Sequence, residues 1–209
     1  LDYYHAESSI ELGSDNHQRV TLDVTGPVND KVRARLNLAY QDSESSLDFL
    51  DYQRVFFAPN VAIDLTDTTN LTIEGSYSAN EWTAMHGGAP LEGSILSNPN
   101  GDYAKSFNPA GDDSYTERDS KDLNIRLTEA ITDRIDARFS YSYVHNTADW
   151  AEYVPFGLDE DNYRSLDRLI FVGRDTYKKD HEVILDLTGE FDTGNVTHNF
   201  IVGLNYRDS

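Results

Sequence analysis

The stretch from Lys31 to Gln41 reads K-V-R-A-R-L-N-L-A-Y-Q and alternates polar with apolar side chains along its whole length. This period of two belongs to a β-strand with two chemically different faces, and no helical period fits it. One face carries Val32, Ala34, Leu36, Leu38 and Tyr40, and the other carries Lys31, Arg33, Arg35, Asn37 and Gln41. Three cations on one face suit contact with water, because a dry core would not tolerate them.

The same alternation recurs along most of the chain. It predicts nine strands, around residues 8–12, 19–24, 31–42, 55–65, 71–77, 123–127, 135–141, 183–187 and 200–206. The connections between them alternate in length, with short turns at 26–30, 66–70, 130–133 and 192–195 and long polar connections at 43–51, 83–118 and 149–178. If consecutive strands are antiparallel, all these short turns lie at one end of the sheet, a sorting that is typical of outer-membrane barrels.

Strand length and tyrosine placement favour the same fold. The run 31–42 reaches the roughly 9 to 11 residues that a tilted strand needs to cross a bilayer. Tyrosines stand near the strand ends that precede the long connections, where an aromatic girdle is expected, at Tyr40, Tyr77, Tyr141, Tyr143 and Tyr206. The sequence therefore predicts an all-β fold: an antiparallel up-and-down transmembrane β-barrel segment of about nine strands, with short periplasmic turns and long extracellular loops.

Composition excludes several other classes of protein. The 209 residues include 37 acidic and 17 basic ones, and a net charge of -20 argues against nucleic acid as a partner. No window approaches the ~20 apolar residues of a membrane helix. The chain has no Cys, its six His show no ligand spacing, and it contains no nucleophile elbow, P-loop or dinucleotide fingerprint. We therefore expect no enzyme, no metal site and no cofactor.

A longer stretch carries a family resemblance. Residues 19–49 read R-V-T-L-D-V-T-G-P-V-N-D-K-V-R-A-R-L-N-L-A-Y-Q-D-S-E-S-S-L-D-F and resemble the early barrel of TonB-dependent siderophore receptors of the ferrichrome type. The likeness continues through Phe57-Ala58-Pro59, the T-D-T-T-N-L-T-I-E-G hairpin at 66–75 and Gly88-Ala89-Pro90-Leu91. It fades into general alternation after about Asp119.

The resemblance implies a function and a set of partners. Such receptors are 22-stranded barrels with an N-terminal plug domain and a TonB box, and they take up ferric chelates across the outer membrane of Gram-negative bacteria. Residues 1–209 are then expected to be a partial barrel domain, without the plug domain and the C-terminal strands. The expected partners are a ferric siderophore, outer-membrane lipid and the TonB complex, which would act through the missing plug. Iron would be present only within the bound siderophore.

Two other functions remain open at this point. The chain could be a complete small outer-membrane barrel of eight or ten strands, acting as a structural protein or a passive pore. It could also be a soluble β-sandwich that binds carbohydrate, because a sandwich strand alternates in the same way.

Aromatic side chains are concentrated in the two longest connections. A ferric siderophore presents iron that is already coordinated, so a receptor is expected to grip its shell with aromatic faces and a few polar donors. The candidate siderophore-binding residues are Trp82, His86, Tyr103, Phe107, Trp150 and Tyr153. The alternative is that these residues pack the loops against each other.

The inward face of the predicted barrel carries several arginines. On this interpretation Arg19, Arg33, Arg35, Arg126 and Arg138 point into the lumen. They are expected to pair with a plug domain or with lumen carboxylates such as Asp23, Asp122 and Asp136.

Overall fold

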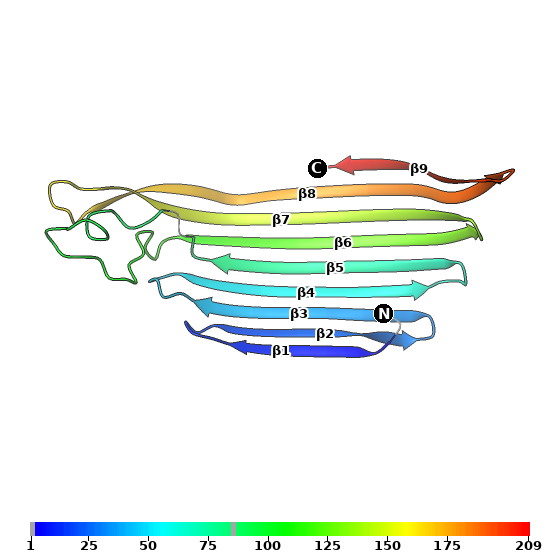
Figure 1. The fold of residues 1–209 in the computed structure, drawn as a ribbon, viewed down its shortest axis with the longest axis horizontal. Helices are drawn as coiled ribbons and strands as arrows, with labels where there is room; N and C mark the ends of the chain where they lie inside the picture. The colour runs from blue at the N-terminus through cyan, green and yellow to red at the C-terminus, as the bar shows by residue number, and fades with distance from the viewer. Residues whose placement is uncertain (1–2, 85–86) are drawn as a thin grey trace.

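The computed structural model describes residues 3–84 and 87–209. They form one antiparallel sheet in which nine strands follow each other in sequence order (Figure 1). The strands are β1 His5–Leu12, β2 Gln18–Asn29, β3 Val32–Glu44, β4 Asp51–Asp64, β5 Thr69–Trp82, β6 Tyr115–Thr132, β7 Ile135–Leu158, β8 Leu166–Thr193 and β9 Val196–Asp208. In this part of the chain there is no helix long and apolar enough to cross a membrane.

The connections are sorted by length between the two ends of the sheet. The end that we call the turn end has connections at 30–31, 65–68, 133–134 and 194–195. The opposite end, the loop end, has connections at 13–17, 45–50, 83–114 and 159–165 (Figure 1). The predicted number of strands and the predicted sorting are therefore confirmed, although the strands continue further into the predicted turns than expected.

One predicted connection is wrong. Residues 149–178 do not form a long loop, because β7 and β8 pair as far as Leu158 and Leu166 and leave only 159–165 as their connection. This extension is a two-stranded ribbon that protrudes beyond the other strands at the loop end (Figure 1). Its sequence lacks strict alternation, and backbone pairing continues there through two register shifts, between Ala148 and Trp150 and between Pro155 and Gly157.

In the part of the chain that the structure describes, no second layer covers the apolar face of the sheet. The buried hydrophobic residues among those described are only Ala62, Ala84, Ala110 and Ala151. Large side chains on the apolar face stay exposed even in the middle of the sheet, such as Phe57 at 43% and Leu185 at 51%. A soluble sandwich would bury such residues between two sheets, so that alternative is not favoured.

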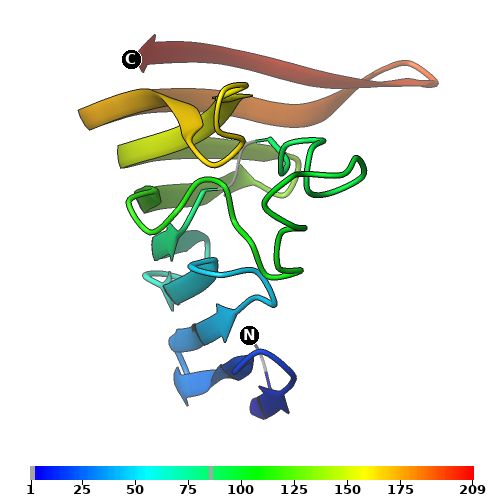
Figure 2. The same cartoon turned by 90° about the vertical axis from the view of Figure 1, so that its left-hand side faces the viewer.

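The sheet is an open, curved wall. Figure 2 shows the strands nearly end-on, with the connection between β5 and β6 on the concave side. In the described residues β1 and β9 occupy opposite edges of the sheet and do not pair with each other. A closed small barrel needs its first and last strands paired, so this alternative is not supported either.

The apolar band crosses the strands obliquely. On β3 it extends up to Tyr40, whose cross-strand row continues through Val55, Ala79 and Asp119 to Thr147 on β7. On β7 the band extends only to Tyr143, four residues nearer the turn end. This stagger of one residue per strand, with a rise of about 3.3 Å and a strand spacing of about 4.8 Å, corresponds to a tilt of roughly 35°. Transmembrane barrels have strand tilts of about 35–45°.

Candidate functional site

The polar face has ion-paired arginines in the half nearer the turn end. Arg33 donates to Asp64 at 2.8 Å, and Arg35 donates to both carboxylate oxygens of Asp23 at 2.9 and 2.5 Å. The other pairs are Arg126 with Glu74, at 3.8 Å, and Arg138 with Asp186. Planar guanidinium groups match carboxylates well, and such pairs join neighbouring strands across the sheet.

The predicted partners of these arginines are partly right. Asp23 does pair with one of the arginines, Arg35. Asp122 instead accepts hydrogen bonds from Ser76, at 2.9 Å, and from Ser120, at 3.1 Å. Asp136 is not the carboxylate of any of these four pairs, because it lies opposite Thr188 while Arg138 lies opposite Asp186. Cross-strand register decides each partner, and the sequence alone does not reveal it.

The half nearer the loop end carries a different set of cations. Arg19, Gln41, Arg54, Asn80 and Arg118 form one cross-strand row on β2 to β6, which we call the arginine row. Arg19 donates to Gln41 at 2.9 Å, the Arg54 guanidinium lies 6.0 Å from the ring centre of Phe56, and that of Arg118 lies 5.3 Å from Trp82. Among the described residues, no carboxylate lies within 4.0 Å of the three guanidinium groups.

Arg54 also has a buried donor nitrogen. Its Nε is buried and has no hydrogen-bond partner among the described residues. A buried donor without a partner costs free energy. The arginine row is therefore a set of cations that no carboxylate of the described residues neutralises.

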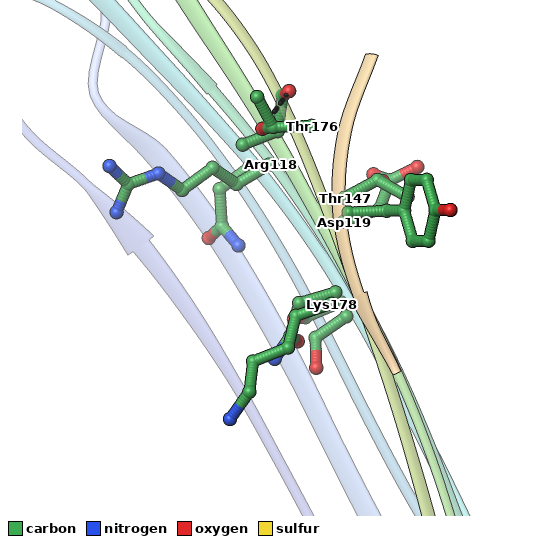
Figure 3. Close-up of a pocket in the computed structure, with 11 residues that line it drawn as sticks. Arg118, Asp119, Thr147, Thr176 and Lys178 are labelled. Carbon is green, nitrogen blue, oxygen red and sulfur yellow. Dashed lines mark hydrogen bonds between the residues drawn. The ribbon is translucent and has the colours of Figure 1, made fainter. Parts of the chain in front are cut away.

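An open cavity of about 560 Å³ adjoins the arginine row. It is lined by Ser78, Asn80, Arg118, Asp119, Ser120, Asn146, Thr147, Ala148, Thr176, Tyr177 and Lys178. Arg118 and Lys178 extend to the same side of the strands (Figure 3). Lys178 also pairs with Asp180 at 2.8 Å, while Thr176 donates to the Ala148 carbonyl at 2.6 Å. The cavity thus combines two cations with hydroxyl and amide groups, which can bind acidic or hydroxylated ligands.

The predicted aromatic residues of the β5–β6 connection pack within it. The rings of Tyr103 and Phe107 stack with centres 4.4 Å apart and planes at 8°. Gly93, at a φ of 97°, lies under Tyr103, where a Cβ would come within 3.0 Å of the ring. Trp82 lies at the end of β5 beneath Arg118. His86, also predicted, lies outside the described residues.

The other two predicted residues lie on β7 rather than in a loop. The Trp150 ring covers Gly173 of β8 so closely that a Cβ at this glycine would lie 2.2 Å from the indole. The Arg168 guanidinium lies 5.0 Å from the ring centre of Tyr153. Of the five predicted residues that the structure describes, Tyr103 and Phe107 stack on each other, the other three have different neighbours, and none of the five lines the 560 Å³ cavity.

The β5–β6 connection binds the connections on both sides of it. The Asp48 amide donates to the Ser106 carbonyl at 2.6 Å, which joins it to the β3–β4 connection. Arg164 donates to the Asn100 side chain at 2.7 Å, and Arg168 donates to the Ala110 carbonyl at 2.7 Å. These contacts hold residues 87–114 over the concave side of the wall (Figure 2). These hydrogen bonds thus pack the connections of the loop end against their neighbours.

A hydrogen bond fixes the base of the β7–β8 ribbon to β6. Tyr115 donates to Asp149 at 2.6 Å, and this bond raises the pKa of the Tyr115 phenol. The Ser114 hydroxyl accepts from the Tyr153 amide at 3.1 Å on the same stretch. The ribbon is therefore anchored where it leaves the sheet.

Sequence reasoning missed Arg54, Asn80, Arg118 and Lys178. Alternation could have placed each of them on the polar face of its strand. Their proximity depends on register between strands, for which the sequence has no local signal.

No family model matches the chain. It is 28% identical over 197 residues to the metal-pseudopaline receptor CntO of Pseudomonas aeruginosa, covering 93% of this chain and 27% of that protein. It is 25% identical over 208 residues to the ferrioxamine B receptor of Salmonella typhimurium, covering 97% of this chain and 29% of that protein. The chain is a homologue of TonB-dependent siderophore and metal receptors. It spans less than a third of the length of either relative.

Solved structures show the same fold for this receptor homologue. The ferric-catecholate import receptor Fiu of E. coli K12 matches with a TM-score of 0.83 at 21% identity, over 99% of this chain and 31% of that one. The ferripyoverdine receptor of the outer membrane of Pseudomonas aeruginosa, bound to ferripyoverdine, also has a TM-score of 0.83, at 23% identity over 99% and 28% of the two chains. The homologues are transport receptors rather than enzymes. In the described part of the chain, no three His, Asp or Glu side chains are grouped as metal ligands.

Proposed function

We propose that residues 1–209 form part of the barrel wall of an outer-membrane receptor that takes up a ferric siderophore. The observation that carries this proposal is the curved single-layer sheet, whose wide apolar face the described residues leave uncovered. Lipid would cover that face, the polar face would line the lumen, and the loop end would lie outside the cell. The TonB complex would act through a plug domain that lies outside residues 1–209.

The arginine row and the adjoining cavity would serve as the wall's contribution to the binding site. They face the concave side, which becomes the lumen of a barrel, and they lie near the end through which a ligand would enter. A ferric siderophore with acidic or oxygen-rich groups would accept hydrogen bonds from the guanidinium groups without losing its iron. Trp82, which already holds Arg118, would place an aromatic surface beside them.

The two faces of the wall can be tested with neighbouring residues. Leu36 lies on the apolar face and Arg35 on the polar face of β3. In the full-length receptor we expect Leu36→Arg to abolish outer-membrane assembly, because a cation at the bilayer midplane costs about 2–4 kcal/mol. Arg35→Leu should be milder. The measurement is the amount of heat-modifiable receptor in the outer-membrane fraction, and equal tolerance of both changes would contradict the proposed wall.

Transport is tested separately by uptake. Cells with the full-length receptor as their only siderophore receptor are offered a panel of ⁵⁵Fe-loaded hydroxamate, catecholate and carboxylate siderophores. At least one should be accumulated, and accumulation should stop when the tonB gene is deleted. A receptor that assembles normally and accumulates none of the panel, or accumulates it without TonB, would contradict the proposed function.

A further inference from the structure

The arginine row is part of a wider basic surface on the polar face. It continues beyond Arg118 to Ala148 on β7 and Thr176 on β8. The adjacent row, two residues nearer the turn end, consists of Thr21, Ala39, Phe56, Ser78, Ser120, Asn146 and Lys178. We call these two rows on β2 to β8 the basic belt. In a chain of net charge -20, the belt has four charged side chains and all of them are cations, namely Arg19, Arg54, Arg118 and Lys178.

The carboxylates nearest to the basic belt lie outside it. Glu11 on β1 is opposite the first arginine of the belt, but its carboxylate approaches His17, at 3.9 Å. Asp180 lies 2.8 Å from Lys178 and 3.1 Å from Arg207, so one carboxylate is shared by two cations. No ion pair joins the three guanidinium groups of the belt to a carboxylate of the described residues. The belt therefore keeps an excess of positive charge.

Two of these cations meet at the 560 Å³ cavity. Arg118 and Lys178 line it and extend to the same side of the strands (Figure 3). The belt also supplies the hydroxyl and amide groups of the lining, from Ser78, Asn80, Ser120, Asn146 and Thr176. Charge-assisted hydrogen bonds from guanidinium and ammonium groups are strongest to negatively charged oxygen atoms. The cavity and the belt therefore favour a ligand that presents several oxygen atoms and carries negative charge.

Ferric siderophores differ in charge according to the groups that coordinate the iron. Three catecholate groups bring two negative charges each to Fe³⁺, so the complex is anionic. A complex with α-hydroxycarboxylate groups also keeps negative charge. Three hydroxamate groups bring only one charge each, so their complex is neutral, or cationic when it carries a free amine. A positively charged surface therefore distinguishes between chelates that contain the same metal ion.

We propose that the basic belt selects the siderophore by charge, so that the transported ligand is a ferric chelate of net negative charge with catecholate or carboxylate oxygens on the iron. The inference rests on the proposed function, because only a closed barrel makes the concave side a lumen. A positively charged lumen wall raises the local concentration of anions and disfavours a cationic chelate. The belt contacts the chelate from outside, and the iron keeps its own ligands.

The first test is the class of chelate that the full-length receptor transports. Cells with no other siderophore receptor are offered ⁵⁵Fe complexes of a tris-catecholate, an α-hydroxycarboxylate, a neutral tris-hydroxamate and a cationic tris-hydroxamate. At least one anionic complex should be accumulated in a TonB-dependent way, and the one accumulated identifies the coordinating group. The hydroxamate complexes should be accumulated about ten-fold less or weaker still.

The outcomes of this uptake test separate the two proposals. TonB-dependent uptake of a hydroxamate complex as fast as that of the anionic complexes would overturn selection by charge and leave the proposed function intact. A receptor that assembles and accumulates none of the four complexes would contradict the proposed function itself.

The second test connects the selection to the belt. In the purified full-length receptor at low salt, Lys178→Gln should weaken binding of the accumulated anionic chelate about five-fold, and Lys178→Arg should retain it. Lys179→Gln is the matched control, because Lys179 is the next residue of β8 and lies on the other face, with its Nζ 5.3 Å from the ring centre of Tyr177. Heat modifiability shows which variants assemble.

Salt provides a readout that needs no variant. Added salt screens exposed charges, so it should weaken binding of the anionic chelate to the wild type. Salt-independent binding, or equal affinity of the assembled Lys178→Gln and Lys179→Gln variants, would overturn the inference.

Discussion

The two halves of the polar face use arginine in opposite ways. Toward the turn end, Arg33, Arg35, Arg126 and Arg138 each meet a carboxylate on a neighbouring strand. Toward the loop end, the arginine row meets an amide and two aromatic rings instead. The first half satisfies its own charge and connects the strands, whereas the second half leaves positive charge open to the concave side. The difference separates arginines that connect the strands from arginines that we propose for ligand binding.

The largest effect is expected in a test of which end of the sheet, the loop end or the turn end, faces the outside of the cell. Gly101 lies in the β5–β6 connection with a φ of 97° and open space around it, and the β2–β3 turn lies at Asp30 and Lys31. We expect an epitope inserted after Gly101 of the full-length protein to bind antibody on whole cells, and one inserted after Asp30 to bind only after lysis. Labelling of the Asp30 insertion alone would reverse the orientation.

The next largest effect is expected in the arginine row. Replacing Arg54 and Arg118 together by Gln should weaken siderophore binding by about ten-fold or more for each residue, because each guanidinium can donate charge-assisted hydrogen bonds. Arg126→Gln is the matched control, since Arg126 shares the strand and face of Arg118 but already pairs with Glu74. Equilibrium binding of the transported chelate decides the matter. An equal loss in all three positions would remove the distinction between the halves.

A smaller effect on siderophore binding is expected from replacing Trp82, which lies in the same loop-end half of the polar face. Its ring supports the Arg118 guanidinium at 5.3 Å, so Trp82→Ala should weaken siderophore binding about two- to five-fold. Trp150→Ala is the comparison, because Trp150 lies in the same cross-strand row as Trp82 but packs on Gly173 rather than under Arg118, so its loss should leave the affinity near that of the wild type. The same binding titration serves both variants, provided their surface expression is normal. A larger loss for Trp150 would place the site on the ribbon instead.

The smallest effect is expected from a paired residue near the turn end. Asp23→Asn removes the carboxylate that accepts two hydrogen bonds from Arg35. Because exposed ion pairs contribute little, we expect the melting temperature of the barrel to fall by only a few degrees and siderophore affinity to stay the same. Differential scanning calorimetry in detergent measures the first and the binding titration the second. A clear loss of affinity would show that the turn-end half also takes part in binding.

Sequence alternation predicted the nine strands, because a strand with one face toward lipid and the other toward water alternates apolar and polar residues. The lengths of the connections then predicted which end of the sheet carries the loops. Alternation failed for residues 149–178, where the ribbon leaves the apolar band and neither of its faces has to be apolar. Because that constraint is absent, residues 150–158 do not show the alternation of a strand; they are W-A-E-Y-V-P-F-G-L. Only the pairing with 166–173 reveals it.

The candidate site was less predictable than the fold. Aromatic content identified Tyr103 and Phe107, which the structure shows stacked on each other inside their own connection. The arginine row was missed because Arg54 and Arg118 are 64 positions apart in the chain and become near neighbours only when three strands take the observed register. A pattern within one strand shows which way a residue faces, but not what lies beside it.

Strand pairing in strict chain order has a consequence for how such a wall can change during evolution. Every strand contacts only its predecessor and its successor, so a hairpin can be duplicated or deleted without changing how the remaining strands pair. The unit of change must be two strands, because a single added strand would send every later loop to the opposite side of the membrane. Gene duplication in hairpin steps therefore conserves orientation, and the circumference of the barrel can grow while its inside and outside stay where they were.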